Sequence, residues 1–287
     1  MSLPLRFRQL GREDLPFADS LRALAGWNQT PEDWKRFLAI EPTGCFLAEW
    51  NGAPAGTATT IVYGPELAWI GMVLVHPEFR RRGIGQGLLR YCIDSLRDRG
   101  VRCIKLDATP LGKTVYDGLG FRDEWTLKRW VRSAVPTRAI SRDAGLRPWR
   151  AGDESLVGPL DAEAFGGSRQ RLLPALASQS RTAVVLEPEG GRPAGFGLLR
   201  SGSQSLYLGP VVGTSATAGI ALIETLAAAS QEQRIYWDVP DENAAAVAWA
   251  EQNGFAVQRP LTRMFLGENV AAGDPRQQFA LAGPEVG

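Results

Sequence analysis

The sequence predicts an α/β fold that is built twice along the chain. Three observations support this prediction. Strand-like and helix-like segments alternate in the first half, residues 67–108 have the strand–helix–strand order of a βαβ unit, and the second half repeats the plan of the first. With 287 residues, 44% of them hydrophobic, the chain is long and apolar enough for two domains of ordinary size.

The elements of the first half follow from residue patterning. Four segments are expected to be strands, with a turn at 63–66 between the last two: 5–9, 44–50, 53–62 and 67–76. Apolar residues then recur at helical spacing from Ile84 to Leu96, and Gly100 is a stop signal, so we expect a helix over 84–99. A buried strand (101–108), a short helix (112–120) and a last strand (121–132) complete this half.

The second half repeats these elements in the same order. "GLRPWRAGDESL" (145–156) resembles "PLRFRQLGREDL" (4–15), and "RIYWDVP" (234–240) resembles "CIKLDATP". We therefore expect two domains, 1–135 and 145–267, joined by a polar linker at 136–144. In the tail, 268–287, the segment "QQFALAG" either adds a strand or docks on the surface.

Composition limits the function classes. The net charge is +1, so no basic field indicates nucleic acid or an anionic membrane as a partner. The three cysteines lack metal-ligand spacing, so no metal site is expected, and their small number fits a reducing compartment. With neither a signal peptide nor a membrane-spanning stretch in the sequence, we expect a cytoplasmic protein.

The segment "HPEFRRRGIGQGLL" (76–89) predicts an anion site. Its glycines allow close backbone approach, and the helix start supplies unpaired N–H groups beside three arginines, which favours a phosphate. The spacing fits neither a dinucleotide fingerprint nor a Walker A motif. The corresponding segment of the second half, "VGTSATAGIALI" (212–223), contains no arginine. We therefore expect one active half and one silent half.

The pattern R-x-x-G-x-G of this loop, followed by "VYDGLGF" (115–121), resembles the two motifs of the GNAT superfamily of N-acetyltransferases. The resemblance covers residues 5–132, and 145–266 in outline. It implies tandem GNAT-like domains, each a mixed, mostly antiparallel sheet flanked by helices, with acetyl-CoA as co-substrate. By this resemblance the cofactor-binding residues are Val73, Leu74, Val75, Arg80, Arg81, Arg82, Gly83, Ile84, Gly85, Gln86 and Gly87.

The resemblance also implies that Tyr116 is the general acid, because a tyrosine with a pKa near 10 stays protonated at neutral pH. The alternative is a tyrosine packed on the core. The N–H near Val73 is the expected carbonyl polariser, on a strand that splays there. For Asp107 two roles stay open, a proton acceptor or ammonium ligand and a cap of the following helix. His76, the only histidine, is a weaker candidate for the base.

Substrate contacts are expected from the variable segment 26–37 and the neighbouring strand. The candidates combine aromatic, amide and acidic groups, which suit an amine with an apolar portion: Trp27, Asn28, Asp33, Trp34 and Trp69. Each tryptophan could equally be a core anchor. The cysteines lie in apolar strands or on an apolar helix face, which argues against an acyl-cysteine route.

These features predict an acetyl-CoA-dependent N-acetyltransferase whose first domain acts on a small amine such as an amino acid, a polyamine or an aminoglycoside. The second domain would brace the fold, wall the acceptor pocket or mimic a dimer partner, so a monomer is preferred over a homodimer. The alternative is an acyl-CoA sensor or scaffold without turnover, which would need only the loop. Protein acetylation lacks any accompanying recognition signature.

Overall fold

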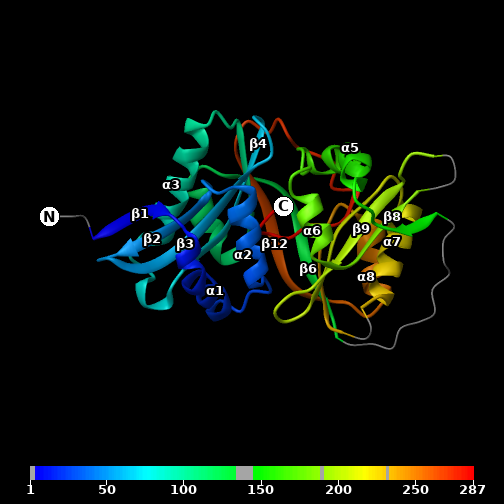
Figure 1. Ribbon diagram of the computed structural model, residues 1–287, viewed down its shortest axis with the longest axis horizontal. Coiled ribbons are helices and arrows are strands. Elements are labelled where there is room, and N and C mark those ends of the chain that lie inside the picture. The colour runs from blue at the N-terminus through cyan, green and yellow to red at the C-terminus, as the bar shows by residue number, and fades with distance from the viewer. Residues whose placement is uncertain (1–3, 134–144, 188–190, 231–232) are drawn as a thin grey trace.

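The computed structural model describes residues 4–133, 145–187, 191–230 and 233–287. The chain forms two lobes side by side, the first half of the sequence in one and most of the second half in the other (Figure 1). Within the described residues no helix is long and apolar enough to cross a bilayer. The linker predicted at 136–144 lies outside the described residues.

The described part of the first half contains four α-helices and six strands. The predicted elements occur in the predicted order, and a further helix over Pro31–Ile40 begins within the segment 26–37, for which no helix is predicted. The observed elements are β1 (Leu5–Gln9), α1 (Leu15–Leu24), α2 (Pro31–Ile40), β2 (Cys45–Trp50), β3 (Ala53–Val62), β4 (Leu67–Val75), α3 (Ile84–Asp98), β5 (Cys103–Ala108), α4 (Pro110–Asp117) and β6 (Arg122–Arg132). Helix α4 begins two residues before the predicted start because Thr109 caps it and Pro110 occupies its first position.

The described part of the second half repeats this series and adds a strand. Its elements are β7 (Leu146–Pro148), α5 (Asp153–Phe165), α6 (Leu173–Ser178), β8 (Ser180–Leu186), β9 (Gly195–Arg200), β10 (Leu206–Gly213), α7 (Ala216–Ala228), β11 (Ile235–Pro240), α8 (Ala244–Gln252), β12 (Ala256–Gly267) and β13 (Gln278–Ala280). Strand β13 lies within "QQFALAG", so the tail adds a strand to the sheet.

The strands form one mixed sheet in the order β1-β2-β3-β4-β5-β12-β6-β11-β10-β9-β8-β7, with β13 paired to β10. Only the β4–β5 and β10–β11 pairs are parallel among the described strands, which confirms the predicted mixed, mostly antiparallel class. Helix α3 buries its apolar stripe, including Ile84, Leu88 and Leu96, against the sheet of the first half.

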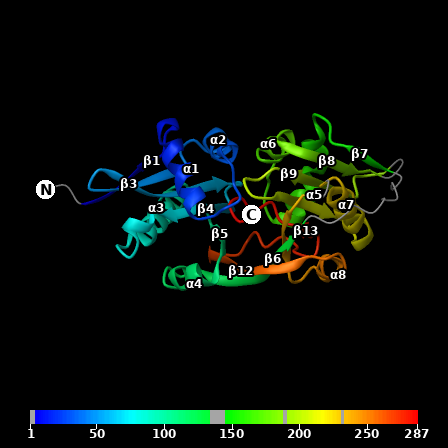
Figure 2. The same ribbon diagram turned by 90° about the horizontal axis from the view of Figure 1, so that it is seen from below.

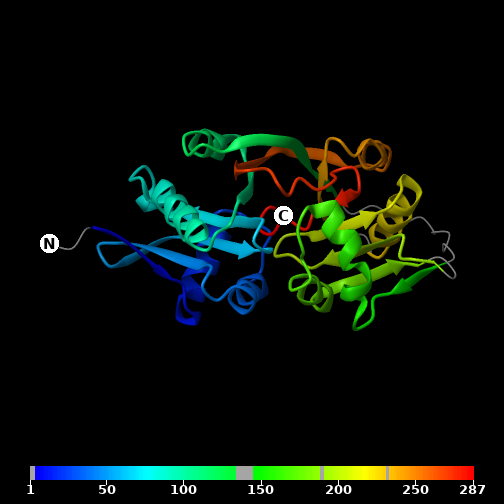
Figure 3. The ribbon, with the colours of Figure 1, turned by 90° about the horizontal axis from the view of Figure 1, so that it is seen from above.

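The last strand of each half lies in the middle of this sheet, beside the other half. Strand β12 pairs with β5 and β6, and β6 in turn pairs with β11. Figure 3 shows β6 and β12 running side by side across both lobes. The halves therefore exchange strands, and the limits predicted for two domains in the sequence do not separate two sheets in space.

Two matching buried ion pairs lie in the exchanged strands. Asp107 of β5 faces Arg263 of β12, and Asp238 of β11 faces Arg129 of β6, each pair directly opposite in register. Both carboxylates are inaccessible to solvent and each accepts two hydrogen bonds from its arginine. A shift in the pairing of β5 with β12, or of β6 with β11, would separate the partners and leave an uncompensated buried charge. The ion pairs therefore favour one register for the exchanged strands.

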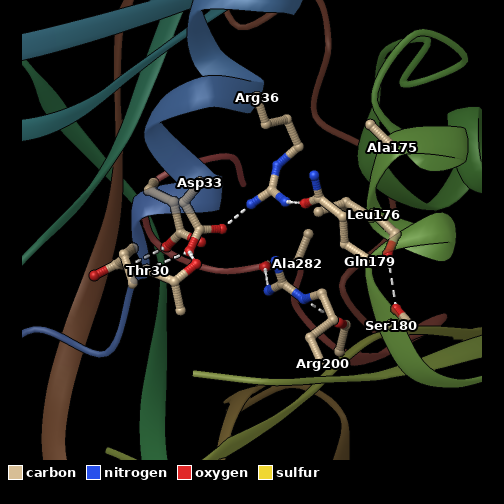
Figure 4. Close-up of polar contacts among 12 residues, drawn as sticks. Thr30, Asp33, Arg36, Ala175, Leu176, Gln179, Ser180, Arg200 and Ala282 are labelled. Atoms are coloured by element: carbon tan, nitrogen blue, oxygen red, sulfur yellow. Dashed lines mark hydrogen bonds and ion pairs between the residues drawn. The ribbon is translucent and has the colours of Figure 1, made fainter. Parts of the chain in front are cut away.

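Further polar groups join the lobes at their interface. Arg36 of α2 donates hydrogen bonds to Asp33 in its own helix and to Gln179 in the other lobe (Figure 4). Below it in the same view, Arg200 of β9 donates to the carbonyl of Ala282 in the tail. The tail thus ends between the lobes, where the C label stands in Figures 1 and 2.

Candidate active site

The centre of the first half is an opening between two parallel strands. Strands β4 and β5 pair only over 67–69 and 103–105, after which β5 continues to Ala108 with β12 as its neighbour. On its other side β4 carries a bulge, since its pairing with β3 shifts between Thr57 and Thr59 and Met72 has a left-handed φ of 50°. The separation of β4 from its neighbour β5 that was expected near Val73 is therefore present.

Two adjoining cavities lie at this opening. The loop cavity, of about 430 Å³, is lined by residues 83–86 at the start of α3. The interlobe cavity, of about 500 Å³, extends between the lobes to Trp27 and Glu285. Both cavities are lined by residues from the end of β4, from the loop before α3 and from α4. The shared lining residues include Val73, Val75, Arg80, Arg81 and Tyr116.

The start of α3 leaves backbone N–H groups without a capping side chain. Gly83 is the N-cap residue, in a left-handed conformation with φ of 77°, and it makes no side-chain cap. The first N–H groups of the helix therefore have no capping side chain to accept from them, and a phosphate oxygen suits them. A Cβ built on Gly83 meets nothing within 4 Å, so the loop is open at this residue.

The three arginines of the loop have different surroundings. Arg81 lines both cavities, with a left-handed φ of 60°. The Arg80 Nε donates to the Val75 carbonyl at 3.2 Å, and this side chain also borders both cavities. The Arg82 guanidinium instead stacks over the Trp50 ring, 5.2 Å from its centroid.

Three of the predicted cofactor residues do not line either cavity. Besides Arg82 these are Leu74, which is buried, and Gly87. A Cβ at Gly87 would lie 2.6 Å from the Phe7 ring, so this glycine is required for packing of α3 against β1. The close approach of Phe7 gives Gly87 a packing role, and the predicted cofactor contacts of Leu74, Arg82 and Gly87 stay predictions.

Tyr116 lies in α4, where its side chain borders both cavities. Its ring packs edge-on to Phe121 with centroids 6.0 Å apart, while its hydroxyl has no hydrogen-bond partner among the described residues. Burial raises the pKa of Tyr116 to about 12, because the phenolate would lose its hydration. The side chain thus combines partial core packing with a protonated, unpaired hydroxyl.

Asp107 borders the interlobe cavity, but both of its carboxylate oxygens are bound to a guanidinium. Its two carboxylate oxygens accept from the Arg263 Nε at 2.9 Å and Nη2 at 3.0 Å. The guanidinium itself lies between the rings of Trp69 and Trp125, 4.5 Å and 4.2 Å from their centroids. The alternative that Asp107 caps α4 is wrong, since the cap is the Thr109 side chain, which accepts from the Gly112 N–H.

His76 lies away from the cavity walls. Its ring packs against Phe79 with centroids 5.8 Å apart, and it borders neither the loop cavity nor the interlobe cavity. This placement supports its secondary position among the base candidates.

Of the substrate candidates, only Trp27 lines the interlobe cavity. The Asn28 amide holds the loop of the second lobe, donating to the Ser205 carbonyl and accepting from its N–H. Asp33 accepts from Thr30 at the start of α2 and pairs with Arg36. These two side chains therefore position the lobes.

Trp34 and Trp69 are corrected to core residues. Both have no exposed surface and belong to the same apolar cluster. The indole Nε1 of Trp69 donates to the Pro284 carbonyl at 2.9 Å, so this tryptophan fixes the tail. Neither ring is accessible to a substrate. The sequence did not reveal this, because its pattern cannot distinguish buried from exposed aromatic residues.

Sequence reasoning missed three residues of the interlobe cavity: Gln29, Arg259 and Glu285. They come from the loop before α2, from the exchanged strand β12 and from the tail. Gln29 lies within the segment 26–37 from which substrate contacts are expected, although it is not among the named candidates. No motif surrounds Arg259 or Glu285, and Gln29 and Glu285 are 256 positions apart, so no local signal indicates that they meet.

The second half has a corresponding opening, but its own tail fills it. Strand β13 pairs with β10 at the register shift near Val211, and the Leu281 N–H donates to the Asp238 carbonyl. At the start of α7, a Cβ on Gly219 would lie 2.4 Å from the Phe279 ring. Phe279 therefore packs directly against the first turn of α7, where the second half was expected to lack a phosphate site.

No group of three or more histidine, cysteine or acidic side chains capable of holding a metal occurs in the described part of the chain. The three cysteines are buried free thiols. Burial raises the pKa of Cys45 to about 12 and that of Cys103 to about 11, so neither is a poised thiolate nucleophile.

Comparisons with known proteins place both halves in one family. The acetyltransferase (GNAT) family model matches residues 13–120, and an acetyltransferase (GNAT) domain model matches residues 157–280. The uncharacterized N-acetyltransferase YitH of Bacillus subtilis (strain 168) is 29% identical over 224 residues, which are 77% of each chain.

Solved structures share the whole architecture. A putative acetyltransferase from Pyrococcus horikoshii superposes with a TM-score of 0.84 at 22% identity, over 100% of this chain and 97% of that one. A tandem GNAT protein from the clavulanic acid biosynthesis pathway has a TM-score of 0.65 at 16% identity, over 94% and 99% of the two chains. This chain therefore belongs to the GNAT superfamily of N-acetyltransferases and carries two GNAT domains in tandem.

Proposed function

We propose that the first half transfers an acetyl group from acetyl-CoA, the co-substrate of the family, to the amine of a small molecule. One observation carries this proposal. The opening between β4 and β5 brings the helix start that suits a phosphate and the unpaired hydroxyl of Tyr116 to the same pair of cavities.

The residues at the opening fit acetyl-CoA. The N–H groups at residues 83–86 would hold the pyrophosphate, with Arg81 beside them, and the unpaired edge of β4 at Val73 and Val75 would hold the pantetheine arm. Bound there, acetyl-CoA would supply an activated thioester carbonyl.

The chain's own groups then perform the transfer. The backbone N–H near Val73 polarises the carbonyl by hydrogen bonding to its oxygen. The bound ammonium first loses one proton to solvent. The neutral amine then forms a C–N bond to the carbonyl carbon and releases a second proton to solvent, and the C–S bond breaks. Tyr116 donates its hydroxyl proton to the departing sulfur and regains one from solvent. The raised pKa of Tyr116 keeps this proton available at neutral pH.

The placement of Tyr116 favours an enzyme over a sensor. A sensor of acyl-CoA needs the phosphate-binding loop alone, whereas here a protonated hydroxyl without a described partner borders both cavities. The interlobe cavity is walled by both lobes, which favours a small acceptor over a protein segment. Because the second half supplies that wall, we propose that the chain acts as a monomer.

Calorimetric titration with acetyl-CoA tests the binding step. We expect one site per chain in the wild-type protein and no binding by Gly85→Glu, which places a carboxylate among the phosphate-binding N–H groups. Two sites per chain would show that the tail does not block the second opening. If no binding is detected, the loop is not a phosphate cradle and the proposed function is wrong.

Thiol release from acetyl-CoA with a panel of amines tests the transfer step. We expect Tyr116→Phe to bind acetyl-CoA as the wild type does and to lose about a hundred-fold or more in kcat, the usual contribution of general acid catalysis. Wild-type turnover by Tyr116→Phe would remove the general-acid role. Binding without thiol release for every amine would instead favour the sensor.

A further inference from the structure

The interlobe cavity contains two charged groups of opposite sign that form no direct ion pair with the described residues. The first is Glu285, in the tail, whose side chain is buried with 5% of the residue exposed. Its Oε2 accepts from the Gln29 Nε2 at 2.7 Å, and no cation of the described chain lies within 4 Å of its carboxylate. Arg36, Arg129 and Arg200 interact with this carboxylate electrostatically, but none of them forms an ion pair with it. A buried carboxylate with no cation in direct contact still favours a cationic ligand.

The neighbour of this carboxylate also presents an acceptor. The Gln29 Oε1 is buried and has no hydrogen-bond partner, while its amide nitrogen is already engaged with Glu285. The same wall of the cavity therefore carries an amide oxygen without a donor and a carboxylate whose one donor among the described residues is the Gln29 amide. An ammonium group, with three N–H donors and a positive charge, satisfies both.

The second group is Arg259 of β12. It pairs in register with Arg129 of β6, so two guanidinium groups occupy facing positions, an unfavourable arrangement unless anions compensate it. Asp238 compensates Arg129 through two hydrogen bonds of 2.7 and 2.6 Å. The Arg259 Nε is buried without a partner, and burial together with Arg129 lowers the pKa of Arg259.

Of the other charged residues that border the cavity, Asp107 is bound by Arg263 and Arg129 by Asp238. Arg80 and Arg81 form no ion pair with the described residues either, but they belong to the loop at the start of α3, which is proposed to hold the co-substrate. Between Glu285 and Arg259 the wall is largely apolar, with Trp27, Leu261 and Met72 among its residues. The cavity is therefore complementary to a ligand that carries a cationic group, an anionic group and an apolar part.

We propose that the acceptor is an amine that also carries an anionic group, of the amino-acid type. Its ammonium contacts Glu285 and Gln29, its anionic group contacts Arg259, and its apolar part lies against Trp27. This proposal rests on the proposed function, because it names the substrate of the same site. The unpaired charges explain the choice physically, since a ligand of complementary charge restores the partners that burial has removed.

The test compares amines that differ only in the anionic group. Leucine, leucinamide and 3-methylbutylamine form one matched series, and phenylalanine and lysine give two more with their amides and decarboxylated amines. Thiol release measures kcat/KM for each. We expect each acid to exceed its amide by about ten-fold or more, the usual effect of one charged hydrogen-bonding group.

Arg259→Met should reduce this preference to about two-fold or less and leave the KM for acetyl-CoA unchanged, while Arg259→Lys should keep part of it. Glu285→Gln should lower kcat/KM for acids and amides alike by about ten-fold or more. Thermal melting shows whether each variant is folded, and Glu285→Asp, which keeps the charge, replaces Glu285→Gln should that variant fail to fold.

Equal rates for acids and amides with the wild type would overturn the proposal and leave the N-acetyltransferase function intact. The same holds if Arg259→Met raises the KM for acetyl-CoA instead, because Arg259 would then contact the co-substrate. If acetyl-CoA binds but no amine in any series releases thiol, the proposed function fails and this inference with it.

Discussion

Replacing Asp107 by asparagine separates a structural role for this carboxylate from a catalytic one. Asp107 has no accessible side-chain surface, and Arg263 is 2% exposed at its side chain. Both carboxylate oxygens are bound to the guanidinium, which lies between two tryptophan rings. The substitution removes the negative charge and leaves the buried guanidinium without its counter-ion.

The expected loss of stability follows from that burial. Removing one partner of a buried ion pair costs about 3–5 kcal/mol, because the remaining charge stays desolvated. For a chain of this size, about 2 °C per kcal/mol corresponds to a melting temperature lower by roughly 6–10 °C. The double variant Asp107→Leu/Arg263→Met replaces both charges by apolar groups and should recover most of this loss.

Chemical denaturation and thiol release, measured on the same preparations, form the assay. If the carboxylate only holds β5 to β12, the double variant should regain turnover together with stability. Asp238→Asn is the matched control for stability, since Asp238 forms the corresponding pair with Arg129 in the second half and should show a loss of similar size.

One result would refute the ion-pair argument. If Asp107→Asn unfolds like the wild type but turns over a hundred-fold or more slower, then Asp107 accepts a proton during catalysis. The double variant would in that case remain inactive whatever its stability.

Three further predictions follow from the described contacts. Gly219→Ala should lower the free energy of unfolding by about 1–3 kcal/mol, because the new Cβ would overlap the Phe279 ring. The affinity for acetyl-CoA should stay unchanged. A denaturation curve like that of the wild type would contradict the close packing. Because an acid acts in its protonated form and burial raises the pKa of Tyr116 to about 12, kcat/KM should show no loss from this group between about pH 8 and pH 10. A decline centred near pH 10 would mean that the hydroxyl is fully hydrated. Finally, the buried thiols, with the pKa of Cys45 raised to about 12, should not react with a disulfide reagent in the folded protein near pH 8, and rapid labelling would show that they are accessible.

The sequence by itself determined the features that contiguous residues specify. The helix over Ile84–Asp98 follows from its apolar spacing, and its uncapped start, which we propose holds a phosphate, follows from the glycines and arginines that precede it. The repeated order of elements predicted two related halves, and the short helix with Tyr116 was found from its own motif. In each case the signal lies within about one element, where backbone propensity and side-chain periodicity act.

Only the tertiary structure decided which residues meet across the two lobes. Asp107 finds its partner 156 positions away because the halves exchange their last strands, and the tail brings Glu285 to Gln29 over 256 positions. Burial is settled at the same level, since Trp27 lines the cavity while Trp34 and Trp69 lie in the core. Strand pairing and the packing of the tail are long-range choices that depend on the whole sheet, so no stretch of sequence contains them.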